Sequence, residues 1–185
     1  FFFPAVLSLV TVGLIFNEIY YRALPEFGKL LGIDALSTSI LSDKSTAIWG
    51  IALINVWQGV ALPAVIFLAG LQSVPQELIE VARLDGANYI QRFRNVVFPF
   101  LVPSLSIVLI LALKSGVLVF DYIMVTTGGG PGRATTSITQ LIIQNAFGGG
   151  FKFSYATAQS FALFVFMAGL SLMQVGVFAR KDAVQ

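Results

Sequence analysis

The sequence has no cysteine and no histidine among its 185 residues. Without them this chain offers no disulfide, no thiolate or imidazole metal ligand, and no histidine general base. Charge is also scarce: charged residues make up 11% of the chain, against roughly 25% in ordinary soluble domains. The net charge of +2, dispersed along the chain, gives no indication of a nucleic-acid partner.

The chain contains several long apolar stretches with few or no charged residues. Hydrophobic residues make up 57% of the chain, and its mean hydropathy is +0.87. Since about 20 apolar residues cross a bilayer as a helix, the pattern predicts an all-α integral membrane protein with about four transmembrane helices. The predicted spans are approximately residues 1–21, 46–71, 99–120 and 153–179.

The first predicted span starts abruptly. Phe1 lies directly in apolar sequence, and no basic segment precedes it, so the start does not resemble a signal peptide. We therefore expect an excerpt that lacks an N-terminal part of a larger membrane protein.

Two of the connecting segments contain helix-like patterns. Residues 22–45 form a polar loop. Within it, helical spacing is shown by Leu24, Phe27, Leu30 and Leu31, and this predicts a short helix lying in the membrane interface. Residues 135–147, between the glycine clusters TTGGGPG and FGGG, predict a surface helix too short to span. Lys and Arg are balanced between the two sides, so charge alone does not orient the chain.

The connection at residues 72–98 is unusually polar. Ser73 and Gln76 match a capping box, which predicts that a helix starts there. That helix is expected to end at Gly86, because glycine readily takes the left-handed conformation, and a second is expected from about Asn88. The product is a helix-turn-helix between two membrane spans.

The stretch EVARLDGANYIQRFRNVVFP resembles the loop of binding-protein-dependent ABC importer permeases, a family with the pattern Glu-Ala-Ala, two residues, Asp-Gly-Ala, then Phe and Pro. Val81 is the one departure, standing where the family usually has Ala. The matching positions are Glu80, Ala82, Asp85, Gly86, Ala87, Phe93 and Pro99.

A second stretch, FDYIMVTTGGGPG, resembles the carbohydrate-uptake branch of that family, of the maltose-permease-like, first-permease-subunit type. NVWQG at 55–59 and YATAQS at 155–160 are similar to segments of that branch, so the resemblance covers nearly the whole chain. It implies that residues 1–185 are a truncated permease domain with a six-span core. The matching positions are Phe120, Asp121, Thr127, Gly129, Gly130 and Pro131.

The resemblance implies that residues 72–98 are a cytoplasmic coupling loop. Implied partners are a second permease subunit, two ATPase subunits and an extracytoplasmic solute-binding protein, in the plasma (inner) membrane of a bacterium or archaeon. This chain would be no enzyme and hold no cofactor or metal, since ATP and Mg would bind to the ATPase subunits. The implied ATPase-coupling residues are Glu80, Ala82, Asp85, Gly86, Ala87 and Phe93.

A solute path is implied around the second and third spans. Lys114 is added on physical grounds, because a charge within a span costs at least about 2.5 kcal/mol and so faces protein or water; snorkelling or structural pairing is the alternative. Interhelical hydrogen bonding is the alternative for the polar members. The implied path residues are Asn55, Gln58, Gly59, Lys114, Ser115, Leu118 and Val119.

Two other functions fit parts of the sequence. A channel would use TTGGGPG as a re-entrant loop, but that leaves the helix-turn-helix unexplained. A membrane enzyme would act at Asp121 or Glu18, without any paired carboxylates or metal-ligand spacing. The solute of an importer stays open among mono- and oligosaccharides, glycerol phosphate and acidic sugars.

Overall fold

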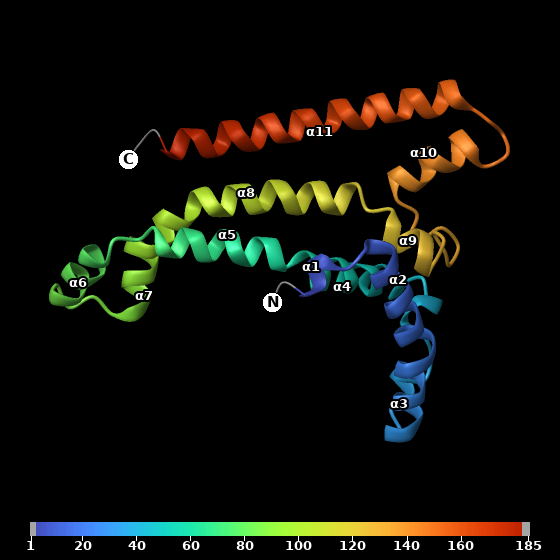
Figure 1. The fold of residues 1–185 in the computed structure, drawn as a ribbon, viewed down its shortest axis with the longest axis horizontal. Helices are drawn as coiled ribbons and strands as arrows, with labels where there is room; N and C mark the ends of the chain where they lie inside the picture. Colours follow the sequence, from blue (N-terminus) through green and yellow to red (C-terminus); the bar gives the residue numbers. More distant parts are fainter. Residues whose placement is uncertain (1–2, 183–185) are drawn as a thin grey trace. The chain divides into compact units, whose positions relative to one another are not determined.

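Helices make up every regular element between residues 3 and 182, the range that the structure, a computed structural model, describes (Figure 1). This confirms the predicted all-α class. The elements are α1 (Phe3–Val6), α2 (Leu9–Glu18), η1 (Ile19–Ala23), α3 (Leu24–Leu31), η2 (Asp34–Leu36), η3 (Ile40–Ser42), α4 (Ala47–Gly59), α5 (Ala61–Gln72), α6 (Gln76–Leu84), α7 (Tyr89–Arg92), η4 (Phe93–Val97), α8 (Phe98–Val117), α9 (Asp121–Thr126), α10 (Ile138–Phe147) and α11 (Phe153–Asp182).

The chain folds as two units. The first unit comprises the chain up to Val60 together with Ser115–Val165. The second unit comprises Ala61–Lys114 and the chain from Phe166 onward. The predicted path residues therefore fall in the first unit, except Lys114, and the predicted coupling loop falls in the second.

The core of the first unit forms where α2, α4 and α9 meet. Gly13 on α2 allows a close approach, because a Cβ there would overlap the side chain of Val125. The Asn17 amide donates to the Val125 carbonyl at 3.5 Å and ties the same two segments. The buried cluster consists of Val12, Tyr20, Leu41, Ile51, Ile54, Tyr122 and Ile123.

The first predicted helix does not end near Tyr21. The chain stays helical from Leu9 to Leu31, and the polar loop starts only after Gly32, whose φ of 68° ends the helix. Pro25 does not break the helix, because the preceding segment Ile19–Ala23 is a widened π turn. A widened turn relieves the clash between a proline ring and the preceding carbonyls. The sequence reading missed this accommodation.

Two helical runs in the described residues are long and apolar enough to cross a membrane: Tyr89–Thr126 and Phe153–Gly176. A third is present if α4 and α5 form one broken span. Residues 1–21 are not among them, so that span stays a prediction. The predicted span 99–120 corresponds to α8, which ends at Val117 and is followed by a non-helical break at residues 118–120.

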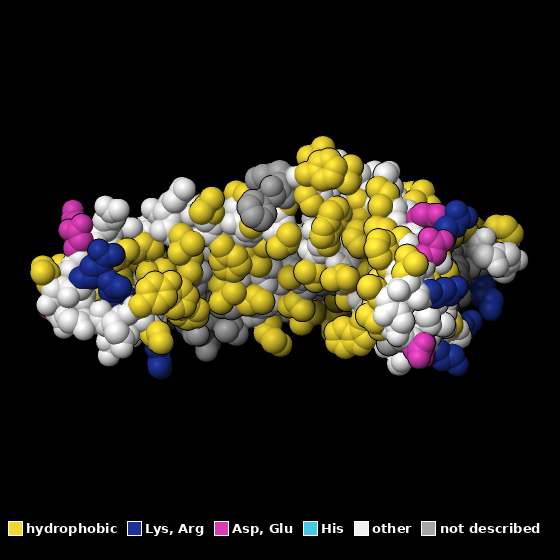
Figure 2. All heavy atoms as spheres, turned by 90° about the horizontal axis from the view of Figure 1, so that it is seen from below, with side chains coloured by type: hydrophobic (Ala, Val, Ile, Leu, Met, Phe, Trp, Pro, Cys, Tyr) yellow, Lys and Arg dark blue, Asp and Glu magenta, His cyan; other side chains and the backbone are white. Residues whose placement is uncertain are grey.

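Most large apolar side chains of the helices are exposed, as Figure 2 shows for one face of the molecule. On α3, Phe27, Leu30 and Leu31 are 63%, 82% and 66% exposed, while Gly28 packs against Leu36. A helix is present over the predicted residues, but it continues from η1 instead of standing apart from the first helix in a polar loop. Its apolar side is free to face lipid, as an interfacial helix requires.

In the second unit, α5 and α8 lie side by side (Figure 1). A Cβ on Gly70 would overlap the Ser104 hydroxyl and lie 3.2 Å from Leu101 Cδ2. Small residues at such crossings let membrane helices approach closely. Gly169 on α11, by contrast, has open space at its Cβ position, since no side chain or neighbouring segment of the described residues comes within 4 Å.

We predict that Gly70→Leu destabilises the permease relative to Gly169→Leu. Overpacking a close helix crossing costs about 1–3 kcal/mol of folding free energy. Because both variants gain equally in helix propensity, Gly169→Leu is the matched control. Thermal unfolding of the purified full-length permease in detergent measures the difference. Equal melting temperatures would contradict the tight α5–α8 crossing.

Candidate functional site

Polar side chains of the first unit gather where its helices are interrupted. α4 ends at Gly59, and residues 118–120 separate α8 from α9. Non-helical backbone at membrane depth is tolerated only where it is buried in protein or lines a cavity, and interrupted helices mark solute sites in transporters. We therefore take this region as the candidate solute site.

Two of the predicted path residues meet there. Asn55 Nδ2 donates to Ser115 Oγ at 3.2 Å, and Asn55 Oδ1 lies 3.5 Å from the same hydroxyl. Asn55 is half-buried and Ser115 is exposed. The structure thus brings an amide and a hydroxyl together at an accessible position, which is the chemistry that hydroxylated solutes require.

Gln58 is placed differently. It is 7% exposed, and both ends of its amide are occupied. Nε2 donates to the Leu7 carbonyl at 2.8 Å, and Oε1 accepts from the Tyr122 hydroxyl at 2.6 Å. Leu7 lies between α1 and α2, so its carbonyl is outside both helices. These contacts favour the alternative that Gln58 makes structural interhelical bonds.

The other predicted path residues have less distinctive surroundings. Gly59 is exposed, with open space at its Cβ position. Leu118 is 37% exposed, whereas Val119 packs against the buried cluster. Lys114, in the last turn of α8, is exposed and forms no ion pair with a described residue. Their contact with solute stays a prediction.

The predicted helix-turn-helix is present as α6 and α7, but its capping differs from the prediction. α6 starts at Gln76 without a side-chain cap, and the Ser73 hydroxyl instead donates to the Gly70 carbonyl at 2.7 Å. The capping box lies at α7. There Asn88 Oδ1 accepts from the backbone N–H of Gln91 at 2.9 Å, and Gln91 Oε1 accepts from the backbone N–H of Asn88 at 2.8 Å.

The turn between the two helices has the predicted geometry. Gly86 has a φ of 77°, where other residues are strained. The Ala87 amide donates to the Ala82 carbonyl at 3.0 Å, and both alanines are half-buried in the turn. Glu80 and Asp85 are exposed, which leaves their carboxylates free for a partner.

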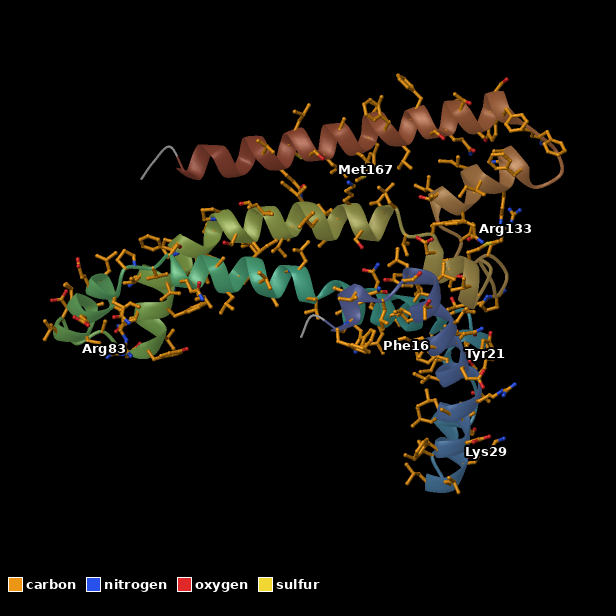
Figure 3. All side chains as sticks on the ribbon, in the orientation of Figure 1. Phe16, Tyr21, Lys29, Arg83, Arg133 and Met167 are labelled. Carbon is orange, nitrogen blue, oxygen red and sulfur yellow. The ribbon has the colours of Figure 1, made fainter. Side chains whose placement is uncertain are left out.

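An apolar tip flanks this turn, and sequence reasoning missed it. Leu84, Tyr89 and Ile90 are 89%, 76% and 74% exposed, in the same segment as Arg83, which Figure 3 labels. Exposed apolar side chains rimmed by charge are typical of protein–protein contacts. The signal was available in the sequence, as large apolar residues on both sides of Asp-Gly.

The second helix of this motif continues directly into α8. The widened turn Phe93–Val97 joins them, and Phe93 is 43% exposed with its ring centroid 6.3 Å from that of Phe98. Pro99 lies in the first turn of α8, directly after the widened turn. The predicted coupling loop 72–98 therefore includes the helical start of the next span rather than a separate connection.

The glycine-rich loop is closed by side chains. The carbonyls of Gly128, Gly129 and Gly130 accept from Gln140 Nε2, Thr136 Oγ1 and Thr135 Oγ1 at 2.7, 3.2 and 2.7 Å. Gln140 is 1% exposed. A selectivity filter presents its backbone carbonyls to a pore, whereas these carbonyls are engaged within the protein. The geometry is that of a rigid connection before α10.

Comparisons with known proteins agree along nearly the whole chain. The family described as "Binding-protein-dependent transport system inner membrane component" matches residues 1–180. The multiple sugar-binding transport system permease protein MsmF of Streptococcus mutans is 45% identical over 175 residues, covering 95% of this chain and 60% of MsmF. The trehalose/maltose transport system permease protein MalF of Thermococcus litoralis is 36% identical over 180 residues, covering 96% and 59%.

A solved structure shares the fold. A chain of a bacterial ABC transporter involved in the import of the acidic polysaccharide alginate aligns with a TM-score of 0.82 and 21% identity, covering 97% of this chain and 63% of that one. The chain spans about three fifths of the length of the curated relatives named above. Since the family match extends over residues 1–180 and MsmF is 45% identical, the chain belongs to the binding-protein-dependent transport system inner membrane components.

Proposed function

We propose that this chain is part of the transmembrane permease subunit of an ATP-driven ABC importer that translocates a sugar or sugar-like solute. The observation that carries the proposal is the helix-turn-helix α6–α7, with its exposed apolar tip, between two apolar helices. Relatives named as permeases for multiple sugars and for trehalose/maltose support the carbohydrate class.

The partners follow from this role. The apolar tip and the carboxylates of Glu80 and Asp85 would dock on an ATPase subunit, with Gly86 and the two alanines shaping the turn. ATP and Mg would bind to a pair of such subunits. A second permease subunit would complete the path, and an extracytoplasmic binding protein would deliver the solute. The complex would lie in a bacterial or archaeal inner membrane.

The solute would meet the Asn55–Ser115 pair. A sugar hydroxyl can donate to Asn55 Oδ1 or accept from either side chain, so it can replace the bond between them. Lys114, next to Ser115 in sequence, would serve an acidic solute as counter-charge. Gly59 and Leu118 would border the same region.

We predict that Leu84→Asp in the full-length permease abolishes solute-stimulated ATP hydrolysis and uptake, because it places a charge in the apolar tip. The control is Gln76→Asp, which adds the same charge at the exposed start of α6. Copurification of the ATPase and both activities are measured. Normal activity in Leu84→Asp would contradict docking through this tip.

We predict that Asn55→Ala raises the KM of sugar uptake about 3- to 10-fold, the effect of one lost hydrogen bond of about 1 kcal/mol. Ser106→Ala is the control, because its hydroxyl donates to the Val102 carbonyl, within its own helix α8. Transport into proteoliposomes containing the assembled complex gives KM and Vmax. An unchanged KM for Asn55→Ala would remove this residue from the solute site.

A further inference from the structure

We propose that Tyr122 and Gln58 are positioning residues that hold the Asn55–Ser115 pair in its solute-binding geometry, without touching solute themselves. The proposal rests on the function proposed above. The hydroxyl of Tyr122, the amide of Gln58 and the carbonyl of Leu7 are together called the clamp. The clamp joins α9, α4 and the interruption between α1 and α2.

The clamp is buried and linked at each step. Tyr122 is 5% exposed and Gln58 is 7% exposed. The two bonds, of 2.6 and 2.8 Å, connect residues 64 and 51 positions apart in sequence. A buried polar group that loses its partner is costly, and no water compensates in a hydrocarbon surrounding. The three segments are thus fixed relative to one another.

The clamp and the solute pair share one turn of α4. Asn55 and Gln58 are three residues apart on that helix and therefore lie on the same face. Their partners lie on opposite sides of the break at residues 118–120: Ser115 precedes it and Tyr122 follows it. Two side chains of α4 thus bridge a segment that has lost its own helical bonds.

Different exposure separates the two roles. The Asn55–Ser115 bond is accessible and can be exchanged for bonds to a solute hydroxyl. The clamp cannot be exchanged in this way without opening the packing around Val12 and Ile54, which are fully buried. If the break moved, Ser115 would move relative to Asn55, and the solute would lose one of its two contacts.

The test compares two buried tyrosines of the first unit. Tyr122→Phe removes one clamp bond. Tyr20→Phe removes a similar bond, from a hydroxyl to the Gly50 carbonyl at 3.1 Å, at the other end of α4. Melting temperature, assembly with the ATPase, and the KM and Vmax of sugar uptake are measured on complexes of the full-length permease. We expect both variants to lower the melting temperature and only Tyr122→Phe to raise KM, by about 3- to 10-fold, the range of one lost hydrogen bond.

A combined variant tests whether the clamp acts through the Asn55–Ser115 pair. Since a positioning residue works through the groups it positions, Tyr122→Phe should not raise KM further in a background that carries both Asn55→Ala and Ser115→Ala. Equal KM values for Tyr122→Phe and Tyr20→Phe overturn the clamp while leaving the importer function intact. An unchanged KM for Asn55→Ala overturns the solute pair, and the clamp with it. No sugar uptake by the wild-type complex overturns the proposed function itself.

Gln58→Glu provides a second variant of the clamp, distinguished by its pH dependence, in case Tyr122→Phe does not assemble. A protonated glutamic acid keeps an acceptor for Tyr122 and a donor for the Leu7 carbonyl, whereas the carboxylate has no donor. We expect KM near the wild-type value at low pH and a several-fold increase as the carboxyl ionises at higher pH. A KM ratio to wild type that is the same across this pH range contradicts the positioning role.

Discussion

Hydrogen bonding of the backbone inside the hydrocarbon region is the constraint on which this structure depends. A helix satisfies its own amides and carbonyls, so each interruption requires another partner. The Leu7 carbonyl is paired by Gln58, and the carbonyls of the glycine-rich loop are paired by threonine and Gln140 side chains. Pro25 and Pro99 each follow a widened turn. The polar pair of the proposed solute site, Asn55 and Ser115, lies close to two helix interruptions: the end of α4 and the break at residues 118–120.

Features that depend on local sequence were predictable. Apolar length predicted helices close to residues 46–71, 99–120 and 153–179, where α4–α5, α8 and α11 lie, and Gly86 predicted the turn because its conformation excludes most other residues. The spacing of Ser73 and Gln76 predicts a capping box at the start of α6. Asn88 makes it instead, since the end of α5 takes the Ser73 hydroxyl. The spacing of a capping box does not show whether the serine hydroxyl will cap the following helix or donate to a carbonyl of the preceding one.

The candidate solute site was only half predictable for a similar reason. Asn55 and Gln58 are both amides on one turn of α4, and the sequence gives them equal standing. Their roles diverge because Tyr122 and Leu7, distant in sequence, enclose Gln58, whereas Asn55 meets an exposed serine. Which amide is enclosed depends on where the interruptions of three helices meet, and single-sequence patterns carry no information on that.

The uninterrupted path from α7 through η4 into α8 has a mechanical consequence. In the proposed coupling role, a flexible connection would absorb a push on the apolar tip, whereas a continuous helix would pass it on to α8 as a torque. The widened turn Phe93–Val97 connects α7 to α8 and holds one residue more than a regular helical turn. Changing it to a regular turn would therefore rotate the rest of α8 about its axis.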